Sequence, residues 1–466
     1  MDFDVIPVVR ELSADTLTPL VAFAALSGES EEAFLFESVE RGENVGRYSF
    51  IGFEPRRNLR FDATVSDPVR VLNDELVPLR VQGEEALPPF FGGAVGYFGY
   101  NVAGWSERIP DSHPNDTGIP DAKLLFFDNV VVFDHVRQRM YVVANVFTTD
   151  GSVEEANQRL DRAIEKLRHA SVEPLAFPPD VETLPFRSTH TQAEYEQMVR
   201  DAKEEIVAGE IFQIVLSQRW DTEFPTSEAL TLYRTLRSIN PSPYMFLLRT
   251  HECTLVGASP EMLVRVTGDV AETRPIAGTR PRGATHAEDV AHQQSLLADP
   301  KENAEHLMLV DLGRNDLGRV CASGTVEVED FKHVERYSHV MHMVTDVHGR
   351  LREDCTPVDA FLSCFPAGTV SGAPKIRAME LIDRFEQTRR GPYAGAVAYF
   401  AFNGNLDSCI TIRTVTLAND RAYVQAGGGI VFDSDPAAEY TETVNKSLAV
   451  RRAVSVAKAV LVQRRS

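Results

Sequence analysis

The chain has 466 residues, and its 68 acidic against 47 basic side chains give it a formal net charge of −21. Nucleic acids and anionic membrane surfaces both repel a polyanion, so neither is expected as a partner. The absence of an apolar run of about 18 residues predicts no membrane span, and five scattered cysteines without a C-x-x-C pair predict reduced thiols in the cytoplasm.

Residues 1–170 are dominated by short apolar or alternating runs, which predict strands. Examples are FLFESV, RYSFIGF, AVGYFGY and KLLFFDNVVVFDH. An amphipathic stretch over 148–170, acidic in its first turn and basic in its last, predicts a helix. Residues 171–189 hold four prolines and little periodicity, so they are interpreted as a linker.

Residues 190–466 begin with a strongly amphipathic helix over 191–211 and continue with strand-like runs interspersed with helices. Long sheets with grouped helices indicate an α+β fold, with large antiparallel sheets packed with helices, rather than regular βαβ alternation. GAVGYF at 93–98 nearly repeats as GAVAYF at 395–400, which raises the possibility of equivalent strands in two halves of the chain.

Two segments combine a helix start with paired carboxylates. Each opens with Asp-Pro, at Asp299 and Asp435, a natural N-cap followed by the preferred first helical residue. Each continues with E-x-x-E, which places two carboxylates on one helix face. The alternatives are two solvated helix faces or a site for a hard cation such as Mg²⁺.

Glycine-rich stretches offer two further candidates. AGGG at 426–429 predicts a turn after a strand, and an anion-binding nest and a simple bend stay equally open. PAGTVSGAPKIRAMELI at 366–382 predicts a loop that opens a helix and could bind an anion.

Three charged features need an explanation. RPIAGTRPRG at 274–283 concentrates three arginines, at 274, 280 and 282, around the small Ala277. Arg413 interrupts an apolar strand, so it is either ion-paired or clamps a substrate carboxylate. His342 lies in a strand-like run, where a structural histidine is more common than a catalyst.

Together these motifs resemble the chorismate-utilising enzymes. The matching segments are RPIAGTRPRG, EHLMLVDLGRNDLGRV, HVMHMV, PAGTVSGAPKIRAMELI, GPYAGAVAYF, IRTVTL and AGGGIVFDSDPAAEYTETVNK, in this order and spacing. The resemblance spans roughly residues 190–455 and extends to FLFES, RYSFIG and NPSPYMF. It is strongest to the anthranilate-forming branch of the family.

The resemblance implies a reaction and its partners. Chorismate and ammonia would give anthranilate and pyruvate, the first step of tryptophan biosynthesis. A separate glutamine amidotransferase subunit would supply the ammonia, within a heterotetramer. The family's metal would be Mg²⁺.

The resemblance also assigns roles to residues. Glu305 and Glu442 would ligate Mg²⁺ directly, with Glu302 and Glu439 beside them. Glu261 would be the general acid at the departing C4 hydroxyl, with a pKa raised by burial or neighbouring carboxylates, and His342 a catalytic histidine. Chorismate would contact Gly278, Thr279, Thr369, Tyr393, Arg413, Gly427, Gly428, Gly429 and Lys446.

Two positions bear on the nucleophile. Relatives that use water carry a lysine where this chain has Gln213, and many relatives that make aminodeoxychorismate carry a lysine where this chain has Ala277. An amide is no general base near neutral pH, and alanine has no functional group. Both residues favour ammonia, and aminodeoxychorismate synthase component I, of the folate pathway, remains the alternative.

The resemblance gives the N-terminal region a regulatory role. Tryptophan, as feedback inhibitor, would bind at Ser38, Pro243, Tyr244 and Met245. Without the resemblance, a strand at LFES and a proline-set turn at NPSPYM would be preferred. The expected organisation is a β-rich regulatory domain at 1–170, a linker at 171–189 and a catalytic domain at 190–466.

Overall fold

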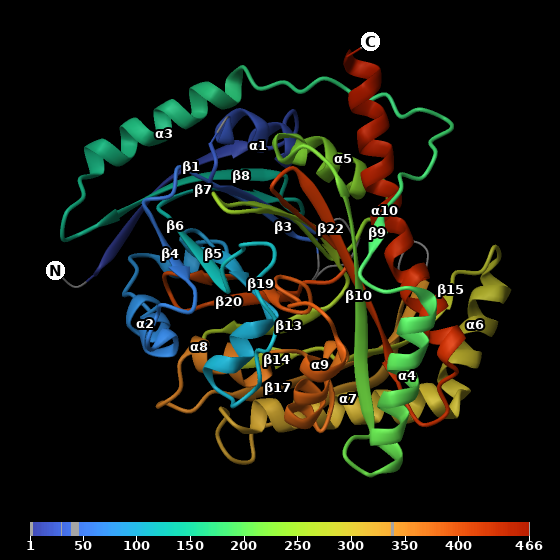
Figure 1. Cartoon of the computed structure of the whole chain (residues 1–466). Coiled ribbons are helices and arrows are strands. Elements are labelled where there is room, and N and C mark those ends of the chain that lie inside the picture. Colours follow the sequence, from blue (N-terminus) through green and yellow to red (C-terminus); the bar gives the residue numbers. More distant parts are fainter. Residues whose placement is uncertain (1–2, 29, 39–45, 337–339, 466) are drawn as a thin grey trace.

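The computed structural model describes residues 3–28, 30–38, 46–336 and 340–465. Within these residues the chain forms two large antiparallel sheets that face each other, with helices on both outer sides (Figure 1). The predicted α+β fold with large antiparallel sheets packed with helices is confirmed.

The first sheet has twelve strands within the described residues, and β9 joins it by pairing with β10. Its order is β1 (Val5–Ser13), β8 (Arg139–Phe147), β7 (Asn129–Asp134), β3 (Tyr48–Phe53), β2 (Ala33–Glu37), β11 (Tyr244–Arg249), β12 (Thr254–Ser259), β21 (Thr414–Ala418), β22 (Arg421–Ile430), β10 (Gln213–Glu223) and β18 (Gly372–Ala373), with β9 at Arg187–Ser188.

The second sheet has ten strands in the same described part of the chain, and β16 joins it by pairing with β17. Its order is β15 (Ile276–Pro281), β17 (Val340–Arg350), β14 (Val270–Thr273), β13 (Met262–Thr267), β20 (Leu406–Ile410), β19 (Ala396–Ala401), β5 (Gly93–Phe98), β6 (Ala122–Phe127) and β4 (Arg57–Phe61), with β16 at Glu327–Arg336.

Both sheets take strands from both ends of the chain. In the first sheet β2 pairs with β11, and in the second sheet β5 pairs with β19. The repeated sequences GAVGYF and GAVAYF are therefore neighbouring strands, matched from Phe98 with Ala396 to Gly93 with Ala401. The stretches 1–170 and 190–466 therefore share both sheets. The expected division of the chain into a regulatory part and a catalytic part remains a prediction about their roles.

Ten α-helices lie in the described residues, most of them on the outer faces of the sheets. They are α1 (Pro19–Ser27), α2 (Pro68–Glu75), α3 (Val153–Arg168), α4 (Gln192–Val207), α5 (Ala229–Ile239), α6 (His286–Ala298), α7 (Pro300–Gly318), α8 (Pro357–Cys364), α9 (Lys375–Phe385) and α10 (Pro436–Arg465). Short 3₁₀ turns occupy Glu84–Ala86, Tyr100–Trp105, Thr226–Glu228 and Gly368–Val370.

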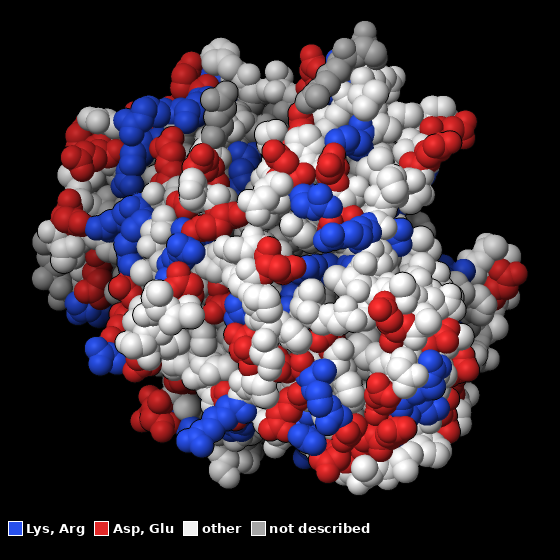
Figure 2. All heavy atoms as spheres, in the orientation of Figure 1, with Lys and Arg blue, Asp and Glu red and all other residues white. Residues whose placement is uncertain are grey.

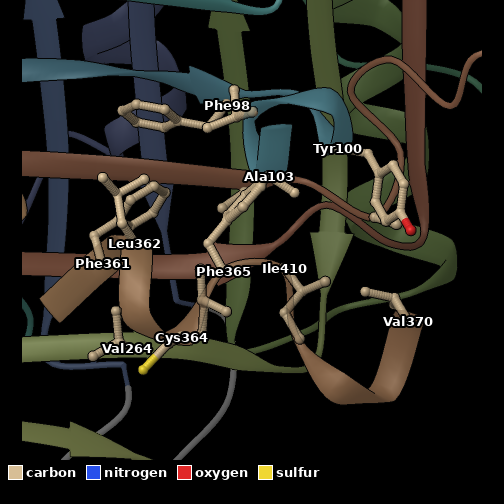
Figure 3. Close-up of a cluster of buried hydrophobic side chains, with 14 of the residues drawn as sticks. Phe98, Tyr100, Ala103, Val264, Phe361, Leu362, Cys364, Phe365, Val370 and Ile410 are labelled. Atoms are coloured by element: carbon tan, nitrogen blue, oxygen red, sulfur yellow. The ribbon is translucent and has the colours of Figure 1, made fainter. Parts of the chain in front are cut away.

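The helices divide between the two outer faces. α1, α3, α5 and α10 share one core with the first sheet, and α7, α8 and α9 share another with the second. Figure 3 shows part of this second core, where Phe98 of β5 packs on Phe361 of α8 at a ring distance of 4.5 Å. Burial of such large rings supplies most of the stabilisation that holds helices on a sheet.

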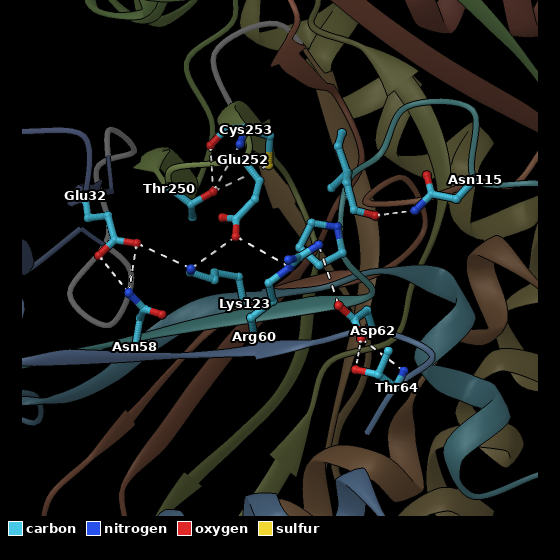
Figure 4. A network of polar contacts seen from close by, with 12 residues as sticks. Glu32, Asn58, Arg60, Asp62, Thr64, Asn115, Lys123, Thr250, Glu252 and Cys253 are labelled. Carbon is cyan, nitrogen blue, oxygen red and sulfur yellow. Dashed lines mark hydrogen bonds and ion pairs between the residues drawn. The ribbon is translucent and has the colours of Figure 1, made fainter. Parts of the chain in front are cut away.

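Between the sheets lies an aromatic core, in which Phe34 of the first sheet packs edge-on against Phe127 of the second at 4.9 Å. A buried polar contact adds to it. Lys123 of β6, only 4% exposed, approaches Glu252 at 3.2 Å and Glu32 at 3.5 Å (Figure 4). Because Glu252 lies in the turn between β11 and β12, this contact fastens the second sheet to the first.

The molecular surface carries both signs of charge. Figure 2 shows acidic and basic side chains interspersed over one face. Among the helices of the described residues, none combines the length and the apolar character needed to cross a membrane.

Candidate active site

The two predicted acidic helices are α7 and α10. The Asp299 carboxylate accepts hydrogen bonds from the backbone of Lys301 and Glu302, and Asp435 accepts one from Ala438. Proline is the first helical residue in both cases. The N-caps predicted from Asp-Pro are confirmed, and they set the four glutamates on the first two turns of the two helices.

Desolvation raises the pKa of Glu305, and the nearby charge of Glu302 raises it further. Desolvation also raises the pKa of Glu439, whose Oε2 is buried without a hydrogen-bond partner among the described residues. The ammonium of Lys446 opposes both shifts.

The four glutamates do not form a closed cluster. Among the described residues, the one group of three or more ligand atoms within 4.8 Å of one another is Glu327, Glu329 and His348, on β16 and β17. Glu442 is half-exposed and bonds Lys446 at 2.7 Å. Of the four, Glu442 lines an open hollow beside the start of α10, whereas Glu439 is buried.

The three arginines of the basic segment all hold carboxylates. Arg274 contacts Asp346 and Glu335 at 2.5 and 2.6 Å. Arg280 contacts Asp299 at 2.8 Å and Glu302 at 3.1 Å, and Arg282 contacts Asp289 at 2.6 Å. The segment forms strand β15 rather than a free loop, and through Arg280 it fixes the first turn of α7.

His342 and Gly278 meet at an irregularity in this strand. The pairing of β15 with β17 shifts register between Ala277 and Thr279, and Gly278 there has φ +66°. Glycine is favoured there because other residues rarely adopt this φ, and a Cβ would also lie 2.6 Å from Leu296 Cδ1 and 2.9 Å from Glu302 Oε2. The Gly278 carbonyl, 3.0 Å from His342 Nδ1, can only accept, which assigns the proton to Nδ1. Desolvation lowers the pKa of His342 and keeps it neutral near pH 7.

Glu261 lies in the turn between β12 and β13. Its Oε1 accepts a hydrogen bond from the Thr369 hydroxyl at 2.9 Å. Desolvation raises its pKa to about 7, although that hydrogen bond and Lys446 both lower it. The predicted raised pKa is confirmed, and its cause is burial rather than neighbouring carboxylates.

The AGGG stretch was wrongly predicted as a turn. It continues β22, and Gly427, Gly428 and Gly429 pair in register with Ser217, Leu216 and Val215 of β10. Added Cβ atoms would lie 2.9 Å from Tyr393 Oη, 3.0 Å from Glu439 Oε2 and 2.7 Å from Gln213 Nε2, respectively. The glycines allow these side chains to approach the strand from both faces.

Arg413 also differs from its prediction, since it lies between β20 and β21 rather than within a strand. Its φ is +51°, an uncommon conformation for a side chain of its size. It donates to the Lys446 carbonyl at 2.9 Å, while Lys446 Nζ donates to the Gly427 carbonyl at 3.1 Å. Arg413, Glu442 and Lys446 line an open hollow of about 700 Å³ beside the start of α10.

Sequence reasoning missed the residues that support Tyr393. Arg390 and Glu386 form a buried ion pair at 2.6 Å, and Arg390 lies over the Tyr393 ring at 5.7 Å. Arg390 also donates to the Val370 and Val215 carbonyls at 2.7 Å each. The sequence held one sign of this support: the Arg-Arg-Gly-Pro stretch, with its two adjacent arginines, comes directly before Tyr393. An arginine that is buried must be paired and hydrogen-bonded, as Arg390 is.

The two positions that bear on the nucleophile occupy different surroundings. Gln213 is the first residue of β10, and its side chain lies against Gly429 of the glycine strand. Ala277 is 7% exposed and pairs with Met343 in β17. Neither position places a general base or a nucleophile in the site.

Four further predicted residues, Ser38, Pro243, Tyr244 and Met245, line one cavity of about 330 Å³. Ser38 Oγ is buried without a hydrogen-bond partner among the described residues. Tyr244 donates to Asp407 at 3.1 Å, and Arg265 contacts the same carboxylate at 3.0 Å. The cavity thus combines aromatic walls with two cationic side chains, Arg47 and Arg265, and two anionic ones, Glu37 and Asp407.

Comparisons with known proteins agree with this arrangement. Residues 31–452 match the family model described as chorismate binding enzyme. Proteins named anthranilate synthase component 1 from Acetivibrio thermocellus and Mycolicibacterium smegmatis are each 45% identical, covering 98% and 97% of this chain and 96% and 91% of their own lengths.

A solved structure supports the same relation. Anthranilate synthase component I from Streptococcus pneumoniae superposes with a TM-score of 0.80 at 36% identity, covering 95% of this chain and 99% of that one. The menaquinone-specific isochorismate synthase from Escherichia coli shares the fold, with a TM-score of 0.73 at 19% identity over 97% and 96% of the two chains.

Proposed function

The chain belongs to the chorismate-binding enzymes, and we propose that it converts chorismate and ammonia into anthranilate and pyruvate. The observation that carries the proposal is Glu261, a carboxyl group with a pKa of about 7. Departure of the C4 hydroxyl as water requires a proton donor that is still protonated near neutral pH. The full-length likeness to proteins named anthranilate synthase component 1 selects this product within the family.

We propose that the acidic turns of α7 and α10 hold Mg²⁺. The donor set consists of carboxylates, which suit a hard cation. The raised pKa values of Glu305 and Glu439 and the unpartnered Glu439 Oε2 fit a site that a cation would complete. Glu305 and Glu442 would be direct ligands, with Glu302 and Glu439 beside them, and the bound ion would neutralise the ring carboxylate of chorismate.

The remaining charges suit the second carboxylate of the substrate, on its enolpyruvyl group. Arg413 lines the open hollow at the start of α10, and Tyr393 lies against Gly427 of the glycine strand. We assign the enolpyruvyl carboxylate to these two side chains and to backbone N–H groups of Gly427–Gly429. Gly278, Thr279, Thr369 and Lys446 complete the proposed substrate contacts.

The proposed reaction has two stages. Ammonia forms a bond to ring C2 while the ring electrons shift and the C4 hydroxyl leaves as water, with the proton donated by Glu261. Loss of the C2 proton and cleavage of the enolpyruvyl C–O bond then release pyruvate and leave an aromatic ring. His342, neutral and protonated at Nδ1, would act beside the C4 hydroxyl.

Ala277 and Gln213 support ammonia as the nucleophile. Ala277 offers no amine that could attack the ring, and the amide of Gln213 cannot act as a general base near neutral pH. The second candidate, a synthase that retains the enolpyruvyl group and makes aminodeoxychorismate, is disfavoured by Ala277. We propose a glutamine amidotransferase subunit as ammonia source, in a heterotetramer.

We propose that tryptophan inhibits by binding in the 330 Å³ cavity. Its indole would pack on the aromatic walls, its carboxylate would face Arg265 and its ammonium Asp407. Residues 1–170 would then supply the regulatory part of the chain, with 171–189 as linker and 190–466 as the catalytic part.

The direct test mixes the chain with chorismate, Mg²⁺ and an ammonium salt at mildly alkaline pH. Formation of anthranilate and pyruvate, followed by fluorescence and chromatography and abolished by EDTA, is expected. Accumulation of aminodeoxychorismate or isochorismate instead would refute the proposal. Glu442→Gln serves as the matched variant, because it removes one acidic group without changing size.

A further inference from the structure

One buried hydroxyl group joins three elements of the fold beside the acidic turn of α7. Thr345, on β17, is 0% exposed, and so is His306, which directly follows Glu305 on α7. His306 Nε2 lies 2.6 Å from Thr345 Oγ1. The same oxygen accepts a hydrogen bond from the backbone N–H of Lys332, on β16, at 3.0 Å. The hydroxyl therefore connects α7, β16 and β17 at one point.

The backbone of β16 is irregular where it reaches this hydroxyl. The pairing of β16 with β17 shifts register between Glu329 and His333, so residues 330–332 lie opposite a single residue, Thr345. The first and the third of these residues have φ values of +42° and +61°, which are uncommon for residues other than glycine. Such conformations persist where surrounding contacts determine them, and bulges beside functional sites redirect side chains.

The side chain that the bulge directs toward α7 is that of Lys332. Its Nζ donates to Asn303 Oδ1 at 2.8 Å. Asn303 lies between Glu302 and Glu305, and its Nδ2 donates to two backbone carbonyls at the junction of α6 and α7, at 2.8 and 2.7 Å. The bulge thus holds the first two turns of α7 through a side chain as well as through the backbone.

These contacts determine how α7 is rotated about its own axis. His306 comes four residues after Glu302, so the two side chains share one face of the helix. Glu302 contacts Arg280 of β15 at 3.1 Å and His306 contacts β17, so this face lies on the second sheet. Because Glu305 directly precedes His306, the rotation that seats the histidine also sets the direction of the Glu305 carboxylate.

We propose that Thr345, His306 and Lys332 are positioning residues for a divalent cation at the acidic turns. They hold α7 at the rotation in which Glu305 reaches the ion, and each acts through the helix rather than by contact with the ion. The proposal rests on the Mg²⁺ site of the proposed function. A role in core packing alone predicts that their loss lowers stability and leaves the affinity for the cation unchanged.

The test is direct binding of Mn²⁺, as a probe of the Mg²⁺ site, to the full chain. The free ion is followed by electron paramagnetic resonance, with and without chorismate and with ammonia withheld. Thr345→Val keeps the shape and removes the hydroxyl, and it should raise the Kd for Mn²⁺ about tenfold. Thr345→Ser restores the hydroxyl and should return the Kd to within about threefold of the parent value.

Thr235→Val is the matched control. Thr235 is also 0% exposed, and its hydroxyl donates to the Thr231 carbonyl at 2.9 Å within α5, which packs on the first sheet. This variant loses a buried hydroxyl group of the same kind away from α7. It should lower the stability of the chain and leave the Kd for Mn²⁺ unchanged.

Lys332→Met provides a second variant in case Thr345→Val does not fold. Through charge alone, removal of this ammonium would strengthen the binding of a cation, because like charges repel. Loss of the hydrogen bond to Asn303 predicts the opposite, a Kd for Mn²⁺ about threefold higher or more. The sign of the change therefore separates positioning from electrostatics.

The outcomes for the parent chain and for the variants answer different questions. If the parent chain binds Mn²⁺ and both Thr345→Val and Lys332→Met bind it equally well, the positioning role is overturned. A Thr345→Ser variant that binds as weakly as Thr345→Val also overturns it. A parent chain that binds no Mn²⁺ refutes the metal site of the proposed function, and the positioning role falls with it.

Discussion

Replacing Glu261 with glutamine should make the folded chain more stable at alkaline pH while removing most of its activity. Burial raises the pKa of this carboxyl from 4.5 to about 7. The folded chain therefore keeps a proton that the unfolded chain releases, and the free energy of unfolding falls as pH rises from about 4.5 to about 7. Glutamine does not titrate, and its Oε1 can still accept from Thr369.

The size of the effect follows from the two pKa values. At about 1.4 kcal/mol per pH unit, the interval from 4.5 to about 7 corresponds to roughly 3 kcal/mol, most of it developed between pH 5 and pH 8. The variant should therefore gain about 2–3 kcal/mol on the parent chain between these two pH values. Loss of the acid should lower kcat by about 10²- to 10⁴-fold.

The assay is urea unfolding of both chains at pH 5 and pH 8, with the linear dependence on urea extrapolated to water. For each chain, the free energy of unfolding at pH 8 is subtracted from that at pH 5. Subtracting the result for the glutamine variant from that for the parent chain then cancels the titration of every group that the two chains share. Thr369→Val provides a second check: it removes a hydrogen bond that lowers the Glu261 pKa, so it should steepen the loss of stability with pH. If the parent chain and the glutamine variant lose stability in parallel, the carboxyl is not desolvated and the argument fails.

Three further predictions concern separate parts of the molecule. Ser38→Phe should fill the 330 Å³ cavity and abolish tryptophan inhibition with most activity kept; unchanged sensitivity in an anthranilate assay would contradict the assignment. Glu305→Gln should raise the Mg²⁺ concentration for half-maximal activity about tenfold or more, and an unaltered Mg²⁺ titration would exclude it as a ligand. Glu386→Gln should lower the free energy of unfolding by about 3 kcal/mol, because it leaves the buried Arg390 without its counter-charge; a loss below about 1 kcal/mol would show that water reaches that arginine.

The sequence predicted best those features that depend on contacts between residues close together in the chain. The caps at Asp299 and Asp435 follow from side chains that bond the next few backbone N–H groups, so four residues suffice to predict them. The strands of residues 93–98 and 395–400 follow from short apolar runs. Their pairing with each other does not, because nothing local shows which of the many strands are neighbours.

The errors concern residues whose conformation is set by distant neighbours. Glycines at 427–429 suggest a turn locally, yet the approach of Tyr393 and Glu439 demands a strand without side chains. Arg413 looks like a strand residue, but it has a φ of +51° and its side chain donates to the Lys446 carbonyl on α10. Tertiary contacts of this kind override local propensity.

The shared sheets also bear on how the proposed inhibition would reach the proposed acid. Tyr244, in the wall of the 330 Å³ cavity, pairs with Ser259, two residues before Glu261. Ser259 Oγ donates to the Ile410 carbonyl at 2.7 Å, and the Ile410 N–H donates to the Glu261 carbonyl at 3.0 Å. Asp407, on the other side of the cavity, lies on the same strand as Ile410. A ligand that binds two arrangements of these strands with unequal affinity would therefore shift the position of Glu261, since the strands that line the cavity are hydrogen-bonded to the segment that carries this residue.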